Sequence, residues 1–166
     1  MRTSSKRMAV CAMMTALTVV LMILGAVLEL GMYACPLLAG VFFILVGEKY
    51  GRKYHVMLYA VSAVLCFLLV PNIEQNLIFA GFFGWYPIIR PGLQKLPKIL
   101  GWIVKFGIFN GVVLAIEWLV MRILVPEAVG SAILWVLLIL GNITFLFYDL
   151  MIPRMEILMR KIAKLL

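Results

Sequence analysis

Long apolar runs, separated by short polar segments, follow one another along the whole chain. Charged residues, glycine or proline mark their boundaries, and the runs cover about residues 8–29, 32–48, 54–71, 74–90, 99–124 and 131–154. A helix that crosses a bilayer needs about 20 mostly apolar residues. The pattern therefore predicts an all-α integral membrane protein, a bundle of about six transmembrane helices.

The composition supports this fold class. The chain is 66% hydrophobic and 13% charged, and its mean hydropathy is +1.14, whereas soluble proteins are about 45–50% apolar and about 25% charged. The first run extends from Met8 to about Leu28, which is longer than the core of a signal peptide, and no small-residue cleavage site is evident. We expect residues 1–166 to form a single transmembrane domain that retains this first helix.

Lysine and arginine gather on one side of the predicted bundle. Of the 15 basic residues, all except Arg122 fall at or near the N-terminus, the linkers 48–53 and 90–98, or the C-terminal tail. Because basic loops stay in the cytoplasm, we expect both chain ends to be cytoplasmic, in the cell membrane of a prokaryote. The amphipathic tail from Arg154 to Leu166 is expected to lie along the inner leaflet. The net charge of +8 thus indicates membrane lipid as a partner, rather than nucleic acid.

The fourth run differs from the others. Within nine residues, Phe79 to Pro87, it contains two glycines, a proline and a cluster of aromatic residues. This predicts a short, bent or partly unwound helix, and interrupted helices often free backbone groups at the solute site of a transporter. In the alternative interpretation, Trp85 and Tyr86 form an interfacial belt and Pro87 simply ends the helix.

Motifs of common enzymes are absent. The chain has no glycine-rich phosphate loop, no two-histidine helix motif and no nucleophile elbow. Its single histidine, His55, stands near a cytoplasmic helix start and is expected to be interfacial. Cys11, Cys35 and Cys66 lie within apolar runs at no metal-like spacing, which indicates packing. We therefore expect no enzyme activity, no catalytic residue, no metal and no cofactor.

Polar residues near the outer ends of the runs are candidates for a solute site, because polar groups are costly in a membrane. We expect them to form an outward-facing pocket roofed by Tyr33, Trp118 and Trp135. Carboxylates outnumber cations there, which favours a neutral or cationic solute. Alternatively, the loop residues are only solvated and Glu117 pairs with Arg122 or with another helix. The predicted substrate-binding residues are Glu29, Glu74, Asn76, Glu117, Trp118 and Arg122.

Other polar and small residues predict contacts between helices. Asn110 and Asn142 lie at mid-depth, where a mutual hydrogen bond would satisfy both amides. Asp149 is at a depth where it could pair with Lys105. Ala12 and Ala16 are four residues apart on one face of the first helix, where small side chains let another helix approach closely. Gly107 and Gly111 have the same spacing, which we interpret as internal packing.

The short six-helix chain, its basic N-terminus, Ala12-x-x-x-Ala16 and the basic cytoplasmic linkers resemble the substrate-binding S components of energy-coupling factor (ECF) type vitamin transporters. The resemblance implies that Ala12 and Ala16 pack on a transmembrane coupling protein driven by two cytoplasmic ATPases. It also implies an outer vitamin site, formed by helices four to six and the loops between helices one and two and between three and four. No vitamin-specific motif has a clear match, so the solute is not implied.

Two alternatives remain open. The first is a non-transporting scaffold similar to the cell-shape membrane protein MreD, which binds other membrane proteins. A scaffold does not need Glu29, Glu74, Asn76 and Glu117 around one cavity, whereas a transport subunit does. The second is an intramembrane enzyme, which would require convergent carboxylates and a defined substrate.

Overall fold

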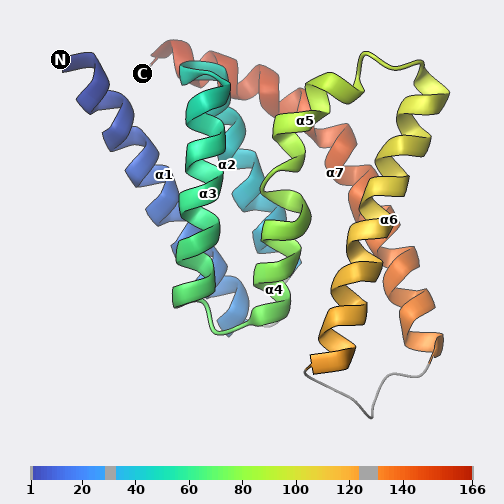
Figure 1. Cartoon of the computed structure of the whole chain (residues 1–166). Coiled ribbons are helices and arrows are strands. Elements are labelled where there is room, and N and C mark those ends of the chain that lie inside the picture. Colours follow the sequence, from blue (N-terminus) through green and yellow to red (C-terminus); the bar gives the residue numbers. More distant parts are fainter. Residues whose placement is uncertain (1, 29–32, 124–130, 166) are drawn as a thin grey trace.

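The computed structural model describes residues 2–28, 33–123 and 131–165, and almost all of them are helical (Figure 1). The elements are α1 (Arg2–Val27), α2 (Ala34–Tyr50), α3 (Arg52–Leu69), α4 (Ile73–Ile78), the π-helix η1 (Phe79–Phe83), α5 (Tyr86–Leu93), α6 (Lys98–Ile123) and α7 (Ser131–Leu165). Each predicted apolar run corresponds to one helix, except the fourth, which is divided among α4, η1 and α5, and the helices α1, α5 and α7 extend beyond the predicted bounds. The all-α prediction is confirmed.

Four helical segments are long and apolar enough to cross a membrane: Ser5–Val27, Arg52–Leu69, Lys98–Val120 and Leu138–Leu158. Many large apolar side chains on these helices, such as Leu68 and Ile99, are exposed rather than packed in the bundle. Water would not stabilise such a surface, whereas lipid tails would. These features indicate a multi-pass membrane protein.

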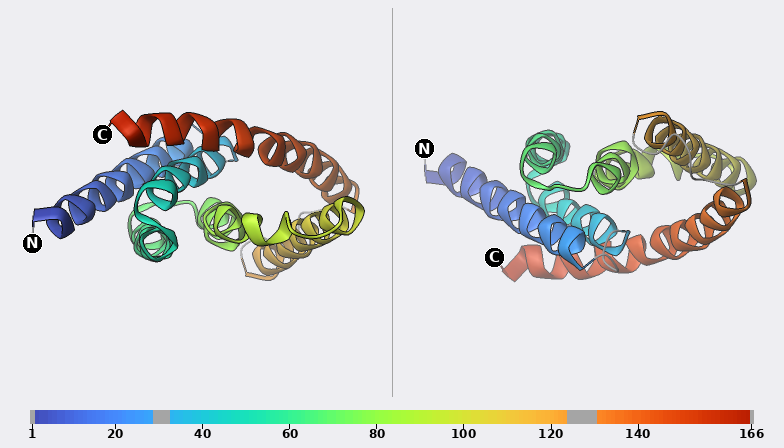
Figure 2. Two further views of the ribbon diagram at one scale, coloured as in Figure 1. Left: turned by 90° about the horizontal axis from the view of Figure 1, so that it is seen from above. Right: turned by 90° about the horizontal axis from the view of Figure 1, so that it is seen from below.

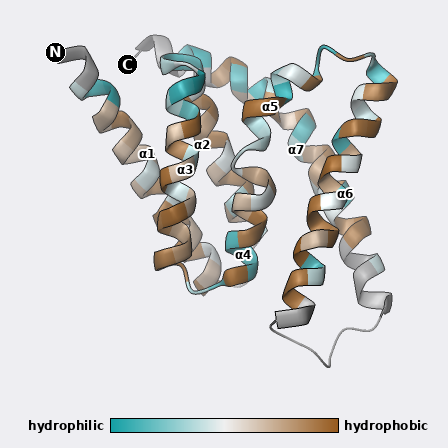
Figure 3. Cartoon of the chain, viewed as in Figure 1, coloured by the Kyte–Doolittle hydropathy of each residue, from teal (hydrophilic) through white to brown (hydrophobic). Residues whose placement is uncertain are grey.

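The helices run back and forth along one axis (Figure 1). The turn from α2 to α3 is very tight because Gly51, at φ 91°, adopts a conformation that residues with a Cβ rarely enter. The start of α1, this turn, the α5–α6 linker and the end of α7 lie at the same end of the bundle. Figure 3 shows hydrophilic residues gathered at that end, around the α2–α3 turn and the α5–α6 linker.

Two hydrophobic cores hold the helices together. The first joins α1, α2 and α3 to Phe79 of η1, and the second joins α2, η1 and α5 to α6 and α7. Phe82 is central to the second, because its ring lies 4.8 Å from Tyr86, 5.0 Å from Phe109 and 5.3 Å from Phe145. The fourth run contributes to both cores, and both views in Figure 2 show α4 and α5 between α3 and α6.

The π-helix confirms that the fourth run is irregular. The Gly84 N–H donates to the Phe79 carbonyl five residues earlier, at 2.8 Å. Tyr59 Oη and Trp85 Nε1 donate to the carbonyls of Ala80 and Gly81, at 2.7 and 2.6 Å. Side chains inside the bundle therefore satisfy these backbone groups, as a membrane interior requires.

The alternative interpretation of the fourth run is wrong in two respects. Tyr86 is fully buried, so it does not belong to an interfacial belt. Pro87 stands in the first turn of α5, where a missing N–H costs nothing, and does not end a helix.

The last helix is longer than the predicted run. It continues through Pro153 to Leu165 and includes the basic tail. Proline lacks an N–H and disturbs the preceding turn, and Figure 2 shows α7 as a curved helix, which packs against α2. There Arg160 donates to both carboxylate oxygens of Glu48, at 2.7 and 3.1 Å. The placement of the tail along the inner leaflet stays a prediction.

Candidate functional site

A cavity of about 310 Å³ opens between α4, η1, α6 and α7, in the half of the bundle away from the chain ends. Its lining is mostly apolar, and its polar members are Tyr33, Glu117 and Thr144. Sites for small molecules are commonly concave, apolar and about 300–1,000 Å³ in volume, with a few polar groups that orient the ligand. The cavity has this character.

Glu117 lines this cavity, which we call the outer cavity because it lies away from the chain ends, and Glu74 reaches its rim through Tyr33. Tyr33 Oη donates to Glu74 Oε1 at 2.8 Å. Burial, this hydrogen bond and the negative charges of Glu74 and Glu117 raise the pKa of Tyr33 well above its usual range, so its hydroxyl stays protonated. Glu117 lines the cavity, and within the described chain no side chain donates a hydrogen bond to it. The rim can therefore attract a cation or accept hydrogen bonds from a solute.

Two other predicted site residues, Asn76 and Trp118, do not line this cavity. Asn76 is buried and donates to the Val70 carbonyl at 3.0 Å, so it fixes the turn between α3 and α4. Trp118 is 60% exposed and Trp135 is also exposed, so neither roofs the cavity. Large aromatic side chains at a helix end commonly lie in the membrane interface. Glu29 and the side chain of Arg122 lie outside the described residues, as does any pairing of Arg122 with Glu117.

Most of the cavity wall was not predicted from the sequence. Phe83, Phe109, Gly141 and Thr144 line it, and three of them are ordinary members of apolar helices. Gly141 carries a weak signal, since a glycine inside a helix often marks a close approach. A Cβ on Gly141 would lie 3.4 Å from the Phe109 ring, so the missing side chain leaves space beside that ring.

A buried ionic cluster lies between this cavity and the end that carries the termini. Asp149 accepts hydrogen bonds from Lys105 Nζ at 2.7 Å, Arg90 Nε at 2.9 Å and Tyr86 Oη at 2.6 Å. Arg90 also donates to Glu156 at 3.2 Å. The predicted pairing of Lys105 with Asp149 is confirmed. The placement of Arg90 in a linker is wrong, because it belongs to α5 and is 2% exposed.

Packed aromatic rings connect the cavity to this cluster. Phe109 lines the cavity and stacks on Phe145, with ring centres 4.8 Å apart and planes at 8°. Phe145 in turn contacts Tyr86, the hydrogen-bond donor to Asp149, at 5.4 Å. The same helices, α6 and α7, thus form both the cavity and the cluster.

The amides of Asn110 and Asn142 also join α6 to α7. Each donates to the other, at 2.9 and 2.8 Å, which confirms the predicted mutual hydrogen bond. Each also donates to the carbonyl four residues earlier in its own helix. The pair therefore leaves no donor without an acceptor, as a membrane-buried amide requires.

The two pairs of small residues, on α1 and on α6, are both exposed. Ala12 and Ala16 are exposed on the outer face of α1, so no other described helix of the bundle covers them. Gly107 and Gly111 are also exposed, and a Cβ on either would meet nothing within 4 Å. The interpretation of this glycine pair as internal packing is therefore wrong.

Histidine and cysteine residues of the described chain are buried. His55 is only 6% exposed, and its ring lies against Gly47 of α2. Its place at the membrane interface stays a prediction. Cys11, Cys35 and Cys66 are buried and free, in agreement with packing. Within the described ranges, no group of three or more histidine, cysteine or acidic residues could hold a metal ion.

No family model matches the chain, and neither a curated protein nor a solved structure is found to be similar to it. Function must therefore be inferred from the cavities, the charges and the exposed faces of the helices.

Proposed function

We propose that this protein is the substrate-binding S component of an ECF-type ABC transporter and takes up a small, vitamin-like nutrient. The outer cavity of about 310 Å³ carries the proposal, because it combines an apolar wall with a few polar groups at its rim. It lies between the helices of the fourth run, α6 and α7, beside Tyr33 at the start of α2. The resemblance to S components implies a site between these elements. The role is binding, without a catalytic step.

The proposed topology has six crossings. In this arrangement α2 and the α4–η1–α5 segment cross the membrane, together with the four spans named above. An even number of crossings agrees with chain ends that lie at one end of the bundle (Figure 1). Since that end carries nearly all basic residues, it faces the cytoplasm, in the cell membrane of a prokaryote.

The proposed partner is a transmembrane coupling protein with two cytoplasmic ATPases. Ala12 and Ala16 are exposed on one face of α1, and Ala9 is exposed one turn earlier. Small side chains let a second helix approach closely in the membrane, where van der Waals packing drives association. This face of α1 is therefore the proposed contact with the coupling protein.

The proposed solute is neutral or cationic. Glu74 and Glu117 bring two carboxylates to the rim, and both charges act on Tyr33. In a partly desolvated site, charges interact more strongly than in water and disfavour an anionic ligand. A ring-containing or amine-bearing nutrient agrees with this field and with the aromatic wall of Phe83 and Phe109.

Native mass spectrometry of the gently purified full chain tests the proposal, because it detects a retained small molecule. Gly141→Leu should fill the cavity next to Phe109 and abolish retention. Gly107→Leu is the matched control, since it adds the same side chain to an exposed glycine of α6. Retention by the wild type and Gly107→Leu, and loss in Gly141→Leu, is the expected result.

Two results would contradict the proposal. One is a wild-type protein that retains no small molecule and is not stabilised by any member of a nutrient panel. The other is equal retention by both leucine variants. Copurification from membranes separates transport from the MreD-like alternative, because a coupling protein with ATPases indicates transport, whereas elongation or cytoskeletal proteins indicate a scaffold.

A further inference from the structure

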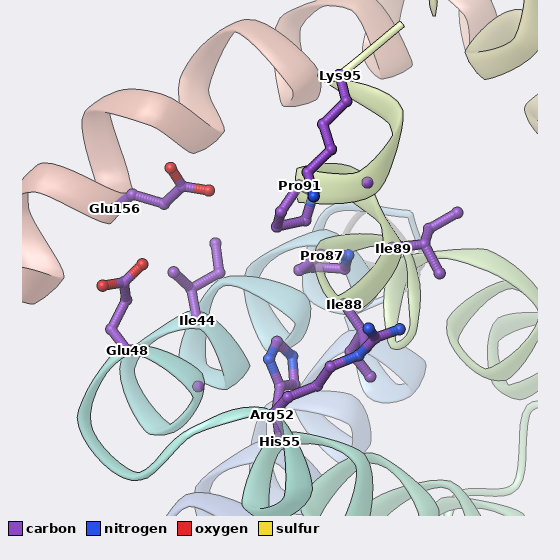
Figure 4. A pocket seen from close by; sticks show the side chains of 12 residues that line it. Ile44, Glu48, Arg52, His55, Pro87, Ile88, Ile89, Pro91, Lys95 and Glu156 are labelled. Atoms are coloured by element: carbon purple, nitrogen blue, oxygen red, sulfur yellow. The ribbon is translucent and has the colours of Figure 1, made fainter.

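A second cavity, of about 380 Å³, is shown from close by in Figure 4. It lies beside the α2–α3 turn, at the end of the bundle that carries the chain termini (Figure 1). Its walls come from α2, α3, α5 and α7 together with Lys95. One wall is apolar and includes Ile44, Pro87 and Ile88. Charged side chains surround this wall, and Figure 4 shows Glu48 and Glu156 on one side, with Arg52 and Lys95 across from them. We call it the inner cavity.

The acidic residues of the inner cavity already have cationic partners. Glu48 pairs with Arg160 at 2.7 Å, and Glu156 pairs with Arg90 at 3.2 Å. In contrast, no carboxylate of the described residues lies within 4.0 Å of the cationic groups of Arg52 or Lys95. Two cations therefore face the cavity without a counter-charge.

The charge balance stays positive when the neighbouring ion pairs are included. Asp149 is shared between Arg90 and Lys105, so it does not supply a spare negative charge. The cations of the cavity and its ion pairs outnumber the carboxylates: Arg52, Arg90, Lys95, Lys105 and Arg160 face Glu48, Asp149 and Glu156. An anion in the cavity would be attracted by this field.

His55 provides a second, independent indication of a ligand. Its imidazole ring lines the inner cavity one turn from Arg52 on α3, and is only 6% exposed. Its Nε2 has no hydrogen-bond partner among the described residues, although buried polar groups normally have one. Since a half-turn of the ring exchanges its nitrogen and carbon positions, the ring can direct an N–H group into the cavity.

The local backbone is built to hold this ring. A Cβ on Gly47 of α2 would lie 2.5 Å from His55 Nδ1, so only glycine lets α3 bring the imidazole so close to α2. The ring also packs edge-on against Phe43, with centres 6.1 Å apart. The position of the unpartnered imidazole is thus fixed by its neighbours.

We propose that the inner cavity binds the phosphate group of an anionic membrane phospholipid. Arg52 and Lys95 supply the charge, His55 donates a hydrogen bond, and the apolar wall accepts the adjoining part of the lipid. The apolar wall favours a lipid over free phosphate. Basic pockets between transmembrane helices at the cytoplasmic side are suited to anionic headgroups. The inner cavity differs from the proposed solute site, so the two proposals can fail separately.

Lipid binding to the full chain tests this proposal. The protein is titrated with phosphatidylglycerol or phosphatidylcholine, and native mass spectrometry counts the bound lipids. We expect a preference for phosphatidylglycerol that falls about 25-fold in the Arg52→Gln/Lys95→Gln double variant, because each basic residue near anionic lipid contributes about fivefold. His55→Phe keeps the ring volume but removes both nitrogens, and should weaken the preference as well.

Matched controls separate a site from general surface charge. Lys53→Gln and Lys98→Gln remove neighbouring basic residues that do not line the cavity, and both should keep the preference. Arg52→Lys retains the charge and should also keep it. Thermal unfolding in phosphatidylcholine shows which variants are folded, and the single substitutions serve as the test if the double variant is not.

Three results would overturn the proposal. The first is a wild-type protein without preference for phosphatidylglycerol. The second is an equal loss in the control and cavity variants, which indicates surface electrostatics alone. The third is displacement of the lipid by inorganic phosphate at equal concentration, which indicates a site for soluble anions.

Discussion

Asp149 is the buried carboxylate that pairs with two buried cations, Arg90 and Lys105. Its carboxylate accepts hydrogen bonds from α5 through Arg90 and Tyr86, and from α6 through Lys105. A buried ion pair contributes little net stability compared with apolar packing, but the loss of one partner leaves a charge without compensation. The cluster therefore makes the correct mutual placement of α5, α6 and α7 a condition for folding.

The substitution Asp149→Asn tests this role. It preserves the size of the side chain but leaves Lys105 and Arg90 without their shared carboxylate, so the free energy of unfolding should fall by about 3–5 kcal/mol. Thermal unfolding of the purified protein measures the change. Glu48→Gln is the control, because it breaks the exposed ion pair with Arg160 and should change the midpoint little. Equal shifts in both variants would contradict the structural role of the cluster.

Under the proposed function, we predict that the charge of Glu117 favours a cationic solute in the outer cavity. Removal of its charge by Glu117→Gln should weaken the binding of a cationic nutrient about tenfold or more, since a charge pair at 4 Å is worth about 4 kcal/mol at an effective dielectric constant of 20, before desolvation. Glu74→Gln should act in the same direction, and Glu48→Gln, at the other end of the bundle, should have no effect. Calorimetry with a nutrient panel measures the affinities. Tight binding of an anionic vitamin, or unchanged affinities in both variants, would contradict the electrostatic argument.

The polar pairs inside the helices could be predicted because a membrane interior offers no water as a hydrogen-bond partner. An amide or a carboxylate in an apolar helix must find a partner at the same depth, and this reasoning predicted Asn110 with Asn142 and Lys105 with Asp149. Arg90 was misplaced because the Pro-Gly that follows it is typical of a linker. In the structure α5 continues through Pro91 to Leu93 and carries Arg90 into the core.

At the scale of elements, the fourth run shows what a sequence pattern can and cannot predict. Its glycines and proline predicted an irregular helix, and the π-helix confirms this. The form of the irregularity depends on α3, because Tyr59 donates to the Ala80 carbonyl and its ring lies against Gly84. A Cβ on Gly84 would lie 2.7 Å from that ring. Such a contact between segments distant in sequence cannot be read from local spacing.

The outer cavity also depends on contacts between segments that are distant in sequence. Its rim residues Glu74 and Glu117 could be predicted because they are charged residues in an apolar chain. Its wall depends on how α4, η1, α6 and α7 are placed around Phe83 and Phe109. Apolar lining residues resemble any other membrane residues in sequence, so their role is visible only once the helices are placed.

Helix α1 carries a prediction about assembly. Replacement of Ala12 or Ala16 by tryptophan should block complex formation and uptake, because a bulky side chain prevents close helix approach. Solute binding by the isolated protein should stay intact, since both positions are exposed and neither lines the outer cavity. Met13→Trp, on the exposed surface of the same helix, is the control. Copurification of a coupling protein measures the effect, and a normal yield with Ala12→Trp and Ala16→Trp would reduce the two alanines to ordinary lipid-facing residues.

At the scale of the whole molecule, the distribution of charge and the placement of the chain ends agree. Hydrophilic residues concentrate at the end of the bundle that carries both termini (Figure 3), which the loop charges alone had predicted. The apolar runs predicted the number and order of the passes because each run is bounded by residues that lipid would not accept. The four long spans do not include α2, which has 17 residues, or the fourth run, which is divided among α4, η1 and α5.

Six crossings and four crossings place the same loops on different sides of the membrane. Both arrangements leave the two termini in the cytoplasm, so a reporter fused after Lys164 does not separate them. If only α1, α3, α6 and α7 cross, the α2–α3 turn at Gly51 lies outside and Asn72 lies inside. If all six passes cross, the turn lies inside and Asn72 lies outside.

We predict six crossings, because the turn is flanked by Lys49, Arg52 and Lys53 and basic loops are retained in the cytoplasm. A reporter that is active only in the cytoplasm should therefore work when inserted between Glu48 and Lys53, and fail at Asn72. It should also fail near Pro126, which both arrangements place outside. A silent reporter at the turn and an active one at Asn72 would establish four crossings. An active reporter near Pro126 with a silent one after Lys164 would reverse the orientation altogether, and the inner cavity with its cations would then face away from the cytoplasm.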